Sequence, residues 1–326
     1  MRYLFRRIGF YLVAAWASIT VNFLIPRMMA GDPVQIMFAR FQGRMDPRSL
    51  DSLYATFGFV RGSLWVQYLT YLGHLFNGDL GLSISNFPVP VTQVIGTSLA
   101  WTVRLLSLAL IISFVLGTLL GILAAWKRGR FVDNFILPAS SLLNSFPYFW
   151  LAMIAVYSLA LGLGWFPLGH AASDDIRQNW GSWEYIRSVI YHATLPALTI
   201  VLTSLGGWLV GMRSSMISVL SQDYVVLAEA KGLTNQRVMF AYAARNAILP
   251  SVTGFAMALA FIIGGQFLTE IVFSYPGMGY TLLLSVNARD YPLMQGIFLM
   301  ITFAVLAANL MVDIVYVFLD PRVRYD

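Results

Sequence analysis

The sequence predicts an all-α integral membrane protein with six transmembrane helices. Of the 326 residues, 58% are hydrophobic and only 11% are charged. Soluble domains carry about 25% charged residues, so a chain this poor in charge must turn most of its surface toward lipid. In addition, six apolar stretches each reach the length of about 20 helical residues that a hydrocarbon core requires.

The first apolar stretch, residues 8–25, follows a basic segment at residues 2–7. It is long enough to span a membrane and no convincing cleavage site follows it, so we expect an uncleaved helix and not a signal peptide. The other five stretches are 101–126, 135–166, 193–212, 251–272 and 293–318. Pro138 and Pro147 lie in the third, where we expect a kink or a short approach helix.

The basic residues predict which side of the membrane each loop occupies. Lysine and arginine are denser before the first span, at 127–130, at 213–245 and after 320 than in the other connections. Cytoplasmic loops carry an excess of these residues. We therefore expect both termini in the cytoplasm, and we interpret the short basic clusters as topology signals and not as a nucleic-acid site.

Two connections are too long to be simple turns. Residues 30–97, after a first helix within 1–29, mix polar and aromatic residues and are expected to form an extracytoplasmic loop with short helices. Residues 213–250 are rich in alanine and contain a single glycine, Gly232. Flexible linkers favour Gly, Ser and Pro, so we expect here a helix–glycine–helix docking shape. A five-helix core at 98–319 and a cytoplasmic tail at 320–326 complete the predicted organisation.

Neither an energy-converting nor a catalytic site is predicted. Lys127 and Lys231, the two lysines, do not follow a glycine-rich phosphate-binding loop, so we do not expect this chain to hydrolyse ATP. The absence of cysteine excludes thiolate metal sites, and the histidines lack metal-site spacing. We expect no metal or cofactor on this chain. The apolar stretches contain few ionisable residues, namely Arg104, Glu270 and Asp313. Ion-coupled carriers usually bury more.

The inner loop is specific enough to identify a family. Residues 222–233 read QDYVVLAEAKGL and residues 245–250 read RNAILP. They resemble the coupling loop of ABC-importer permeases of the dipeptide, oligopeptide and nickel branch, which typically reads QDYVxxAxAKGL and then RNALLP. The resemblance covers essentially the whole chain, since the branch also matches MRYLFRR at 1–7, GDP at 31–33, QY at 67–68, GDLG at 78–81, YPGMG at 275–279, RDYP at 289–292 and LDPRVRY at 319–325.

The sequence departs from the family pattern in three places. Val226 occupies the position of the glutamate in the general importer motif, so Glu229 is not taken for that glutamate. FGFVRG at 57–62 replaces the usual LGLDxP. Arg104 stands where the branch often has an acidic or neutral residue.

The resemblance implies the type I ABC-importer permease fold and import by alternating access in a bacterial inner membrane. It implies four kinds of partner: a second homologous permease in a heterodimer, two ATPase domains that hold ATP and Mg, an extracytoplasmic substrate-binding protein and the lipid bilayer. It favours oligopeptides or dipeptides as solute. Cello-, xylo- or manno-oligosaccharides and nickel chelates stay open, and an ATP-independent secondary carrier is the alternative from another class.

The predicted ATPase-coupling residues lie in the inner loop. They are Asp223, Tyr224, Ala228, Glu229, Ala230, Lys231, Gly232, Leu233, Arg245 and Pro250. Small alanines let a short helix seat closely in a groove of another protein, and Gly232 permits a sharp reversal after it. Asp223 is expected to cap the free amides at the start of the helix.

A second set of polar and aromatic residues is the predicted translocation path or gate. It comprises Arg104, Asn144, Tyr148, Trp150, Gln266 and Glu270. Arg104 and Glu270 either pair to close an outer gate or reach the interface separately. The residues around Pro147 either line the path or serve helix packing. Asp313 is expected to hold the last span against a neighbouring helix.

Overall fold

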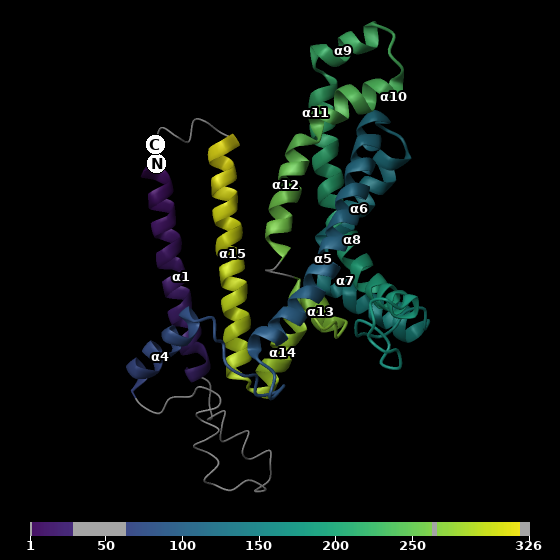
Figure 1. Cartoon of the computed structure of the whole chain (residues 1–326). Coiled ribbons are helices and arrows are strands. Elements are labelled where there is room, and N and C mark those ends of the chain that lie inside the picture. Colours follow the sequence, from purple (N-terminus) through teal and green to yellow (C-terminus); the bar gives the residue numbers. More distant parts are fainter. Residues whose placement is uncertain (1, 29–62, 263–265, 320–326) are drawn as a thin grey trace. The chain divides into compact units, whose positions relative to one another are not determined.

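The computed structural model describes residues 2–28, 63–262 and 266–319 (Figure 1). These residues are mostly helical and contain no β-strand; an isolated antiparallel bridge joins Leu82 and Pro90. The predicted all-α membrane fold is confirmed. The chain forms two compact units: residues 1–102, 263–267 and 276–326 make the first, and residues 103–262 and 268–275 make the second.

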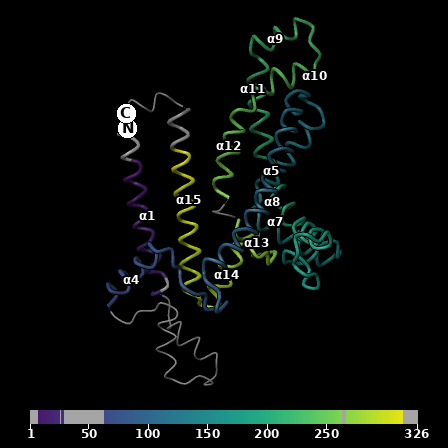
Figure 2. The backbone as a smooth tube through the Cα atoms, viewed as in Figure 1, coloured from purple at the N-terminus to yellow at the C-terminus, as the bar shows by residue number. Residues whose placement is uncertain are grey.

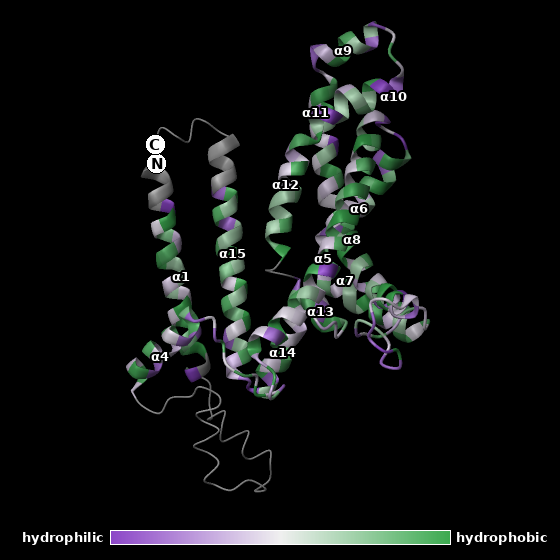
Figure 3. Ribbon diagram, viewed as in Figure 1, coloured by the Kyte–Doolittle hydropathy of each residue, from purple (hydrophilic) through white to green (hydrophobic). Residues whose placement is uncertain are grey.

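Four helices of the described part of the chain are long and apolar enough to cross a membrane. They are α1 (Arg2–Met28), α5 (Val91–Trp126), α8 (Trp183–Leu220) and α15 (Tyr291–Leu319), and they contain four of the predicted stretches. Figure 3 shows hydrophobic residues along much of α5, whereas α10 and the loop before α8 are hydrophilic. This distribution agrees with long helices surrounded by lipid and polar ends in water.

Two of these helices are longer than predicted. At 1.5 Å per residue, α5 and α8 each exceed about 50 Å, against about 30 Å for the hydrocarbon core. Consequently the predicted loop at 30–97 ends before Val91, where α5 begins, and the predicted loop at 213–250 starts inside α8. Residues 29–62 of the first loop lie outside the described residues.

The third predicted span is a bent pair of helical segments. The first arm consists of η1 (Val132–Ile136), a π-helix, and α6 (Leu137–Ser145); the second consists of α7 (Tyr148–Ala155) and a further π-helix, η2 (Val156–Gly162). The arms meet at 99°, and Pro147 precedes α7 at the bend. The expected kink is confirmed there, whereas Pro138 lies in the first turn of α6, where proline is tolerated.

The predicted span at 251–272 is not one helix. α12 (Leu249–Ala260) ends at Phe261, and α13 (Phe267–Val272) is a separate short helix. The 12 residues of α12 measure about 18 Å, which is too short to cross a bilayer alone. The sequence has Gly264 and Gly265 between the two helices, and glycine is unfavourable in a helix interior. With the bent pair taken as one, up to five helices of the described residues are long and apolar enough to span, which is consistent with the predicted six.

In the first unit, α1 and α15 pack side by side in opposite directions (Figure 2). Near one end, the Tyr11 hydroxyl donates to Asp313 at 2.7 Å, and Arg7 lies 3.3 Å from the same carboxylate oxygen. Near the other end, the Asn22 amide donates to the carbonyl of Gln295 at 2.8 Å. Asp313 thus holds the last span against α1, as expected, and the Arg7 end of α1 lies beside the Asp313 end of α15.

A buried carboxylate fixes the turn between α14 (Met278–Ala288) and α15. The Oδ2 atom of Asp290 accepts hydrogen bonds from the Ser83 hydroxyl at 2.6 Å, the Ser85 hydroxyl at 2.7 Å and the Ser85 amide at 2.9 Å. A buried charge is costly unless donors surround it. These three donors therefore tie the loop before α5 to the start of α15.

In the second unit, α8 makes close backbone contacts with two neighbours. A Cβ atom added to Gly206 would lie 2.5 Å from the carbonyl oxygen of Ser140 in α6. Cβ atoms at Gly117 and Gly121 of α5 would lie 2.6 Å and 2.7 Å from atoms of α8. Glycines four residues apart allow membrane helices to approach closely, so these three positions set the spacing of α5, α6 and α8.

We expect Gly206→Val to destabilise the contact between α6 and α8, because the added methyl groups overlap the Ser140 backbone. Overpacking of this kind costs about 1–3 kcal/mol. Gly207→Val is the matched control, since nothing lies within 4 Å of a Cβ atom there. The unfolding temperature of the purified protein in detergent should fall for Gly206→Val only; equal stability of the two variants would contradict the packing argument.

Candidate functional site

The segment between α8 and α12 forms a small helical platform in the second unit (Figure 1). It consists of α9 (Asp223–Ala230), α10 (Asn235–Arg237), the π-helix η3 (Val238–Ala244) and α11 (Arg245–Ala247). We call these residues, 223–247, the α9–α11 platform. The helix–glycine–helix shape predicted from the sequence is present, with Gly232 between α9 and α10.

Gly232 ends α9 in a specific hydrogen-bond pattern. Its φ is +72°, in the left-handed region that favours glycine. Its amide donates to Glu229 O at 2.9 Å, and the Leu233 amide donates to Ala228 O at 3.4 Å. These two bonds form a Schellman motif, which satisfies the last free carbonyls of a helix. The reversal after α9 therefore requires the glycine.

The predicted capping role of Asp223 is wrong. Gln222 is the N-cap residue, in extended conformation, and no side chain caps the helix; Asp223 is the first residue of α9. A carboxylate in the first turn still interacts favourably with the positive end of the helix dipole. Asp223 thus favours α9 through charge and not through a capping hydrogen bond.

One face of α9 is anchored in the protein. Val225 and Ala228 are buried against Val238 of η3, and Leu233 packs on the same cluster. Trp126, at the end of α5, also packs there. The platform is therefore packed against the ends of the long helices.

A second cluster continues this attachment. It joins Met212 and Met216 of α8 to Met239 and Ala243 of η3, with Ile122 of α5 alongside. All are buried. A displacement of the platform must then move the adjoining ends of α5 and α8, because packed interiors transmit shifts as rigid contacts.

The opposite face of α9 is exposed and largely apolar, with Asp223 at its start. Val226 and Leu227 are 54% and 55% exposed, and Tyr224 is 40% exposed. Ala230, one turn further, is exposed as well. A helix that is apolar on both sides at a polar end of the molecule is typical of a surface that another protein covers.

Four of the remaining coupling candidates are also exposed. Glu229, Lys231 and Arg245 are exposed, and Pro250 lies in the first turn of α12 with its side chain exposed. Ala228 and Leu233, in contrast, point into the anchoring cluster. The sequence-predicted set therefore divides into residues available to a partner and residues that hold the platform in place.

Sequence reasoning missed Asp133, which lies beside the beginning of the predicted coupling loop. The Nε atom of Arg213, near the end of α8, donates to its Oδ1 atom at 2.6 Å, and the Gly129 amide donates to Oδ2 at 2.9 Å. Both side chains are largely buried. The sequence shows that Asp133 follows the basic turn at 127–130. Its partner Arg213 is 80 residues away and can be identified only from the fold.

Arg104 and Glu270, the candidate gate residues, share a neighbour. Burial raises the pKa of the Tyr275 phenol, the Glu270 carboxylate raises it further and the Arg104 guanidinium opposes that rise. Glu270 is fully buried, and the Arg104 guanidinium lies 4.6 Å from the ring centroid of Trp180. Both charges therefore act on the same buried phenol, while their direct pairing stays a prediction.

The other path candidates lie elsewhere. Asn144 ends α6 beside Gly206, and Tyr148 and Trp150 begin α7 across the bend. Gln266 precedes α13, and its Oε1 atom is buried with no hydrogen-bond partner in the described part of the chain. The bend collects three of the six candidates, and their role in a path stays a prediction.

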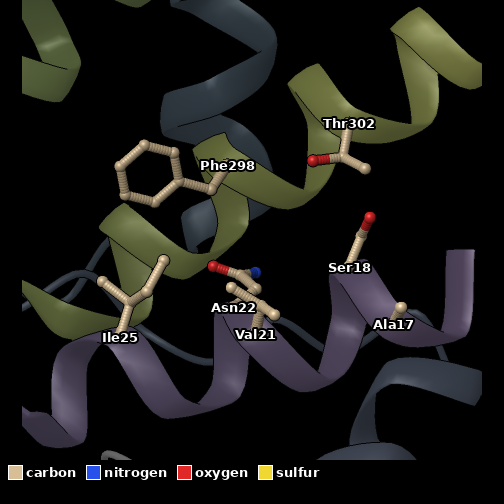
Figure 4. A pocket seen from close by; sticks show the side chains of 7 residues that line it. All are labelled: Ala17, Ser18, Val21, Asn22, Ile25, Phe298 and Thr302. Atoms are coloured by element: carbon tan, nitrogen blue, oxygen red, sulfur yellow. The ribbon is translucent and has the colours of Figure 1, made fainter. Parts of the chain in front are cut away.

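A pocket of about 290 Å³ lies between α1 and α15. Figure 4 shows its lining, which consists of Ala17, Ser18, Val21, Asn22, Ile25, Phe298 and Thr302. None of the coupling or path candidates lines it. It is a groove on the packed helix pair and not the predicted route for solute.

Known proteins resemble the chain over its whole length. The family model described as "Binding-protein-dependent transport system inner membrane component" matches residues 117–325. The oligopeptide transport system permease protein AppB of Bacillus subtilis is 32% identical, over 94% of this chain and 93% of that protein. The dipeptide transport system permease protein DppB of Escherichia coli and the di/tripeptide transport system permease protein DppB of Pseudomonas aeruginosa are each 31% identical, over 100% of this chain and 99% of theirs.

We expect Asp133→Asn and Arg213→Met each to destabilise the protein, because each leaves one partner of the pair unsatisfied in a largely buried place. The cost of such a loss is about 1–3 kcal/mol. The double variant should lose less than the sum of the two, as residues in direct contact do. Unfolding temperatures provide the measurement, with the exposed Asp175→Asn as control; strict additivity would show that the pair contributes nothing.

Proposed function

The chain belongs to the family of binding-protein-dependent transport system inner membrane components, and we propose that it is the permease subunit of an ATP-driven importer of oligopeptides or dipeptides. The observation that carries the proposal is the α9–α11 platform, which is anchored on one face and exposed and apolar on the other. The chain acts as the membrane path, and ATP hydrolysis takes place in partner subunits.

The exposed face of α9 is the docking surface for an ATPase domain. Val226, Leu227 and Tyr224 fill a groove of that partner, and Glu229 and Lys231 contact its rim. Ala230 permits close approach because it adds little bulk. The Schellman motif at Gly232 holds α9 at a fixed angle to the rest of the platform, so the partner meets a rigid surface.

Import then proceeds by alternating access. When two ATPase domains bind ATP with Mg and close, the docked platform shifts as a rigid body. The buried contacts with Trp126, Met212 and Met216 carry this shift into α5 and α8. The Asp133–Arg213 pair carries it onward to η1 and α6, since it joins these elements near the platform.

The assembly contains a second homologous permease, in a heterodimer, and an extracytoplasmic binding protein that delivers the solute. The membrane is a bacterial inner membrane, and the basic segments support a cytoplasmic position for the platform and both termini. Residues 98–319 form the permease core, with residues 213–250 as its coupling loop. Arg104 and Glu270 form the outer gate beside Tyr275, and Asn144, Tyr148, Trp150 and Gln266 contribute to the path.

A peptide solute is favoured by the names of the relatives, which are oligopeptide, dipeptide and di/tripeptide permeases. Oligosaccharides and nickel chelates are the competing solutes, because similar sequence patterns serve them. Binding of peptide, oligosaccharide and nickel-chelate panels by the partner binding protein tests the choice. We expect micromolar or tighter binding of peptides, about −8 kcal/mol or better; binding confined to another panel would contradict it.

A secondary carrier without an ATPase is the alternative from another class. The two hypotheses differ in the composition of the purified protein. We expect the tagged chain to co-purify with nucleotide-binding subunits in a fixed ratio and its uptake activity to require ATP. Uptake by the chain alone, driven by an ion gradient, would support the carrier.

We expect Gly232→Asp to uncouple ATP hydrolysis from transport, because it strains the left-handed turn and places a charge beside the docking face. A loss of about 1.4 kcal/mol of docking free energy lowers the affinity tenfold. Gly164→Asp is the matched control, since Gly164 also has a positive φ, +65°, with nothing within 4 Å of an added Cβ atom.

The measurement is solute uptake together with ATPase stimulation in proteoliposomes. Gly232→Asp should lose both, while Gly164→Asp should retain both apart from any loss of stability. Normal uptake and normal stimulation in Gly232→Asp would count against docking on the platform.

A further inference from the structure

The first unit carries a short helix with an apolar face that the described part of the chain leaves exposed. α4 (Leu64–Phe76) begins at Ser63, whose hydroxyl accepts a hydrogen bond from the Val66 amide and caps the helix. Trp65, Leu69 and Phe76 are 66%, 50% and 85% exposed. These positions follow helical spacing of i, i+4 and i+11, so they form one stripe along α4.

α4 lies beside α1 (Figure 1), and a different side of it, carrying Tyr68 and Tyr71, packs on α1. The Tyr68 hydroxyl lies 2.7 Å from the Thr20 hydroxyl, and its ring meets Phe23 edge-on with centroids 5.1 Å apart. The ring centroids of Tyr71 and Phe23 are 5.6 Å apart. These contacts fix the position of α4 on α1.

These contacts determine the depth of α4 in the membrane. The apolar span of α1 ends at Ile25, and Phe23 lies two residues before that end, about 3 Å along the helix axis. Leu24, next to Phe23, is an exposed apolar residue at this end of the span. These contacts thus put α4 at the level where the apolar span of α1 ends.

The sides of α4 also differ in polarity. Gln67 and His74 lie roughly opposite the apolar stripe; Gln67 accepts a hydrogen bond from Arg27 Nε at 3.0 Å, and His74 lies 3.1 Å from Asp79. Tryptophan in the stripe is characteristic of residues at membrane interfaces. An apolar face toward lipid with a polar face toward water is the pattern of an interfacial helix.

We propose that α4 is a membrane-interface anchor, with the Trp65–Leu69–Phe76 face inserted among the lipids of the leaflet at the Ile25 end of α1. The topology of the proposed function makes this the outer leaflet; the anchoring itself follows from the contacts with α1. The anchor holds residues 63–90, which precede α5, against the bilayer surface. Its occupant is phospholipid, because the Tyr68 contacts with Thr20 and Phe23 hold α4 at the Ile25 end of an apolar span and tryptophan is characteristic of membrane interfaces.

The absence of cysteine from the chain permits a direct test. Leu69→Cys and Phe76→Cys place a fluorophore on the stripe, and His74→Cys places it on the polar side of the same helix. The full chain, with its co-purifying subunits, is reconstituted in phosphatidylethanolamine–phosphatidylglycerol vesicles with or without acyl-brominated lipid. Iodide serves as the aqueous quencher, and the unmodified chain gives the background.

We expect brominated lipid to quench the labels at 69 and 76 roughly twofold or more above the label at 74, because an interfacial helix buries only its apolar face. Iodide should give the reverse order. Strong iodide quenching at all three sites with little lipid quenching would place the stripe in water and overturn the proposal. Protection of 69 and 76 from both quenchers would show that another protein covers the stripe, which also overturns it. Two positions in the stripe are labelled so that the test can still be made if one variant fails to fold.

Discussion

The close contact of α8 with its neighbours is the constraint on which the second unit depends. A membrane interior offers helices little hydrophobic reason to associate, so close packing must supply the attraction. Gly206 brings α6 within carbonyl contact of α8, and Gly117 and Gly121 do the same for α5. The same helix then continues past these contacts to Arg213 and ends just before α9. One rigid element thus connects the membrane contacts with the platform.

This continuity is what the proposed coupling role of the platform depends on. The buried face of α9 rests on residues from α5, α8 and η3, and a well-packed interior does not absorb a displacement by compressing. Gly232 prevents α9 from continuing as a straight helix and its Schellman motif fixes the turn. A partner that holds the exposed side of α9 therefore holds the ends of two long helices.

The sequence predicted the structure best where the surrounding lipid or the backbone of a single residue determines it. Stretch 8–25 became a span because lipid forces apolar chain into helix, and the glycine turn was predicted because few residues tolerate a positive φ. Family resemblance located the platform, but not the division of its residues into anchoring and exposed sets. Hydropathy did not predict the full length of α5 and α8, because these helices continue beyond their apolar stretches. It also predicted one span where α12 and α13 are separate helices.

Local sequence also could not find interactions that depend on the fold. Asp223 looked like a cap because aspartate favours that position, yet Gln222 holds the extended conformation that defines it. Asp133 meets Arg213 only because α8 returns alongside η1, and Asp290 meets Ser83 and Ser85 only because two distant turns adjoin. Such contacts join segments far apart in the chain, and no local pattern predicts them.

The charged residues of the apolar helices show how the protein uses charge. Asp313 contacts Arg7 and Tyr11, and it holds two helices together. Glu270 and Arg104 act on one buried phenol. Proton- and ion-coupled carriers arrange buried ionisable groups along a pathway, whereas Asp313 joins two helices and Glu270 and Arg104 lie near one buried tyrosine. In the proposed function the driving force comes from a partner ATPase, and the exposed face of α9 is the surface proposed for its docking.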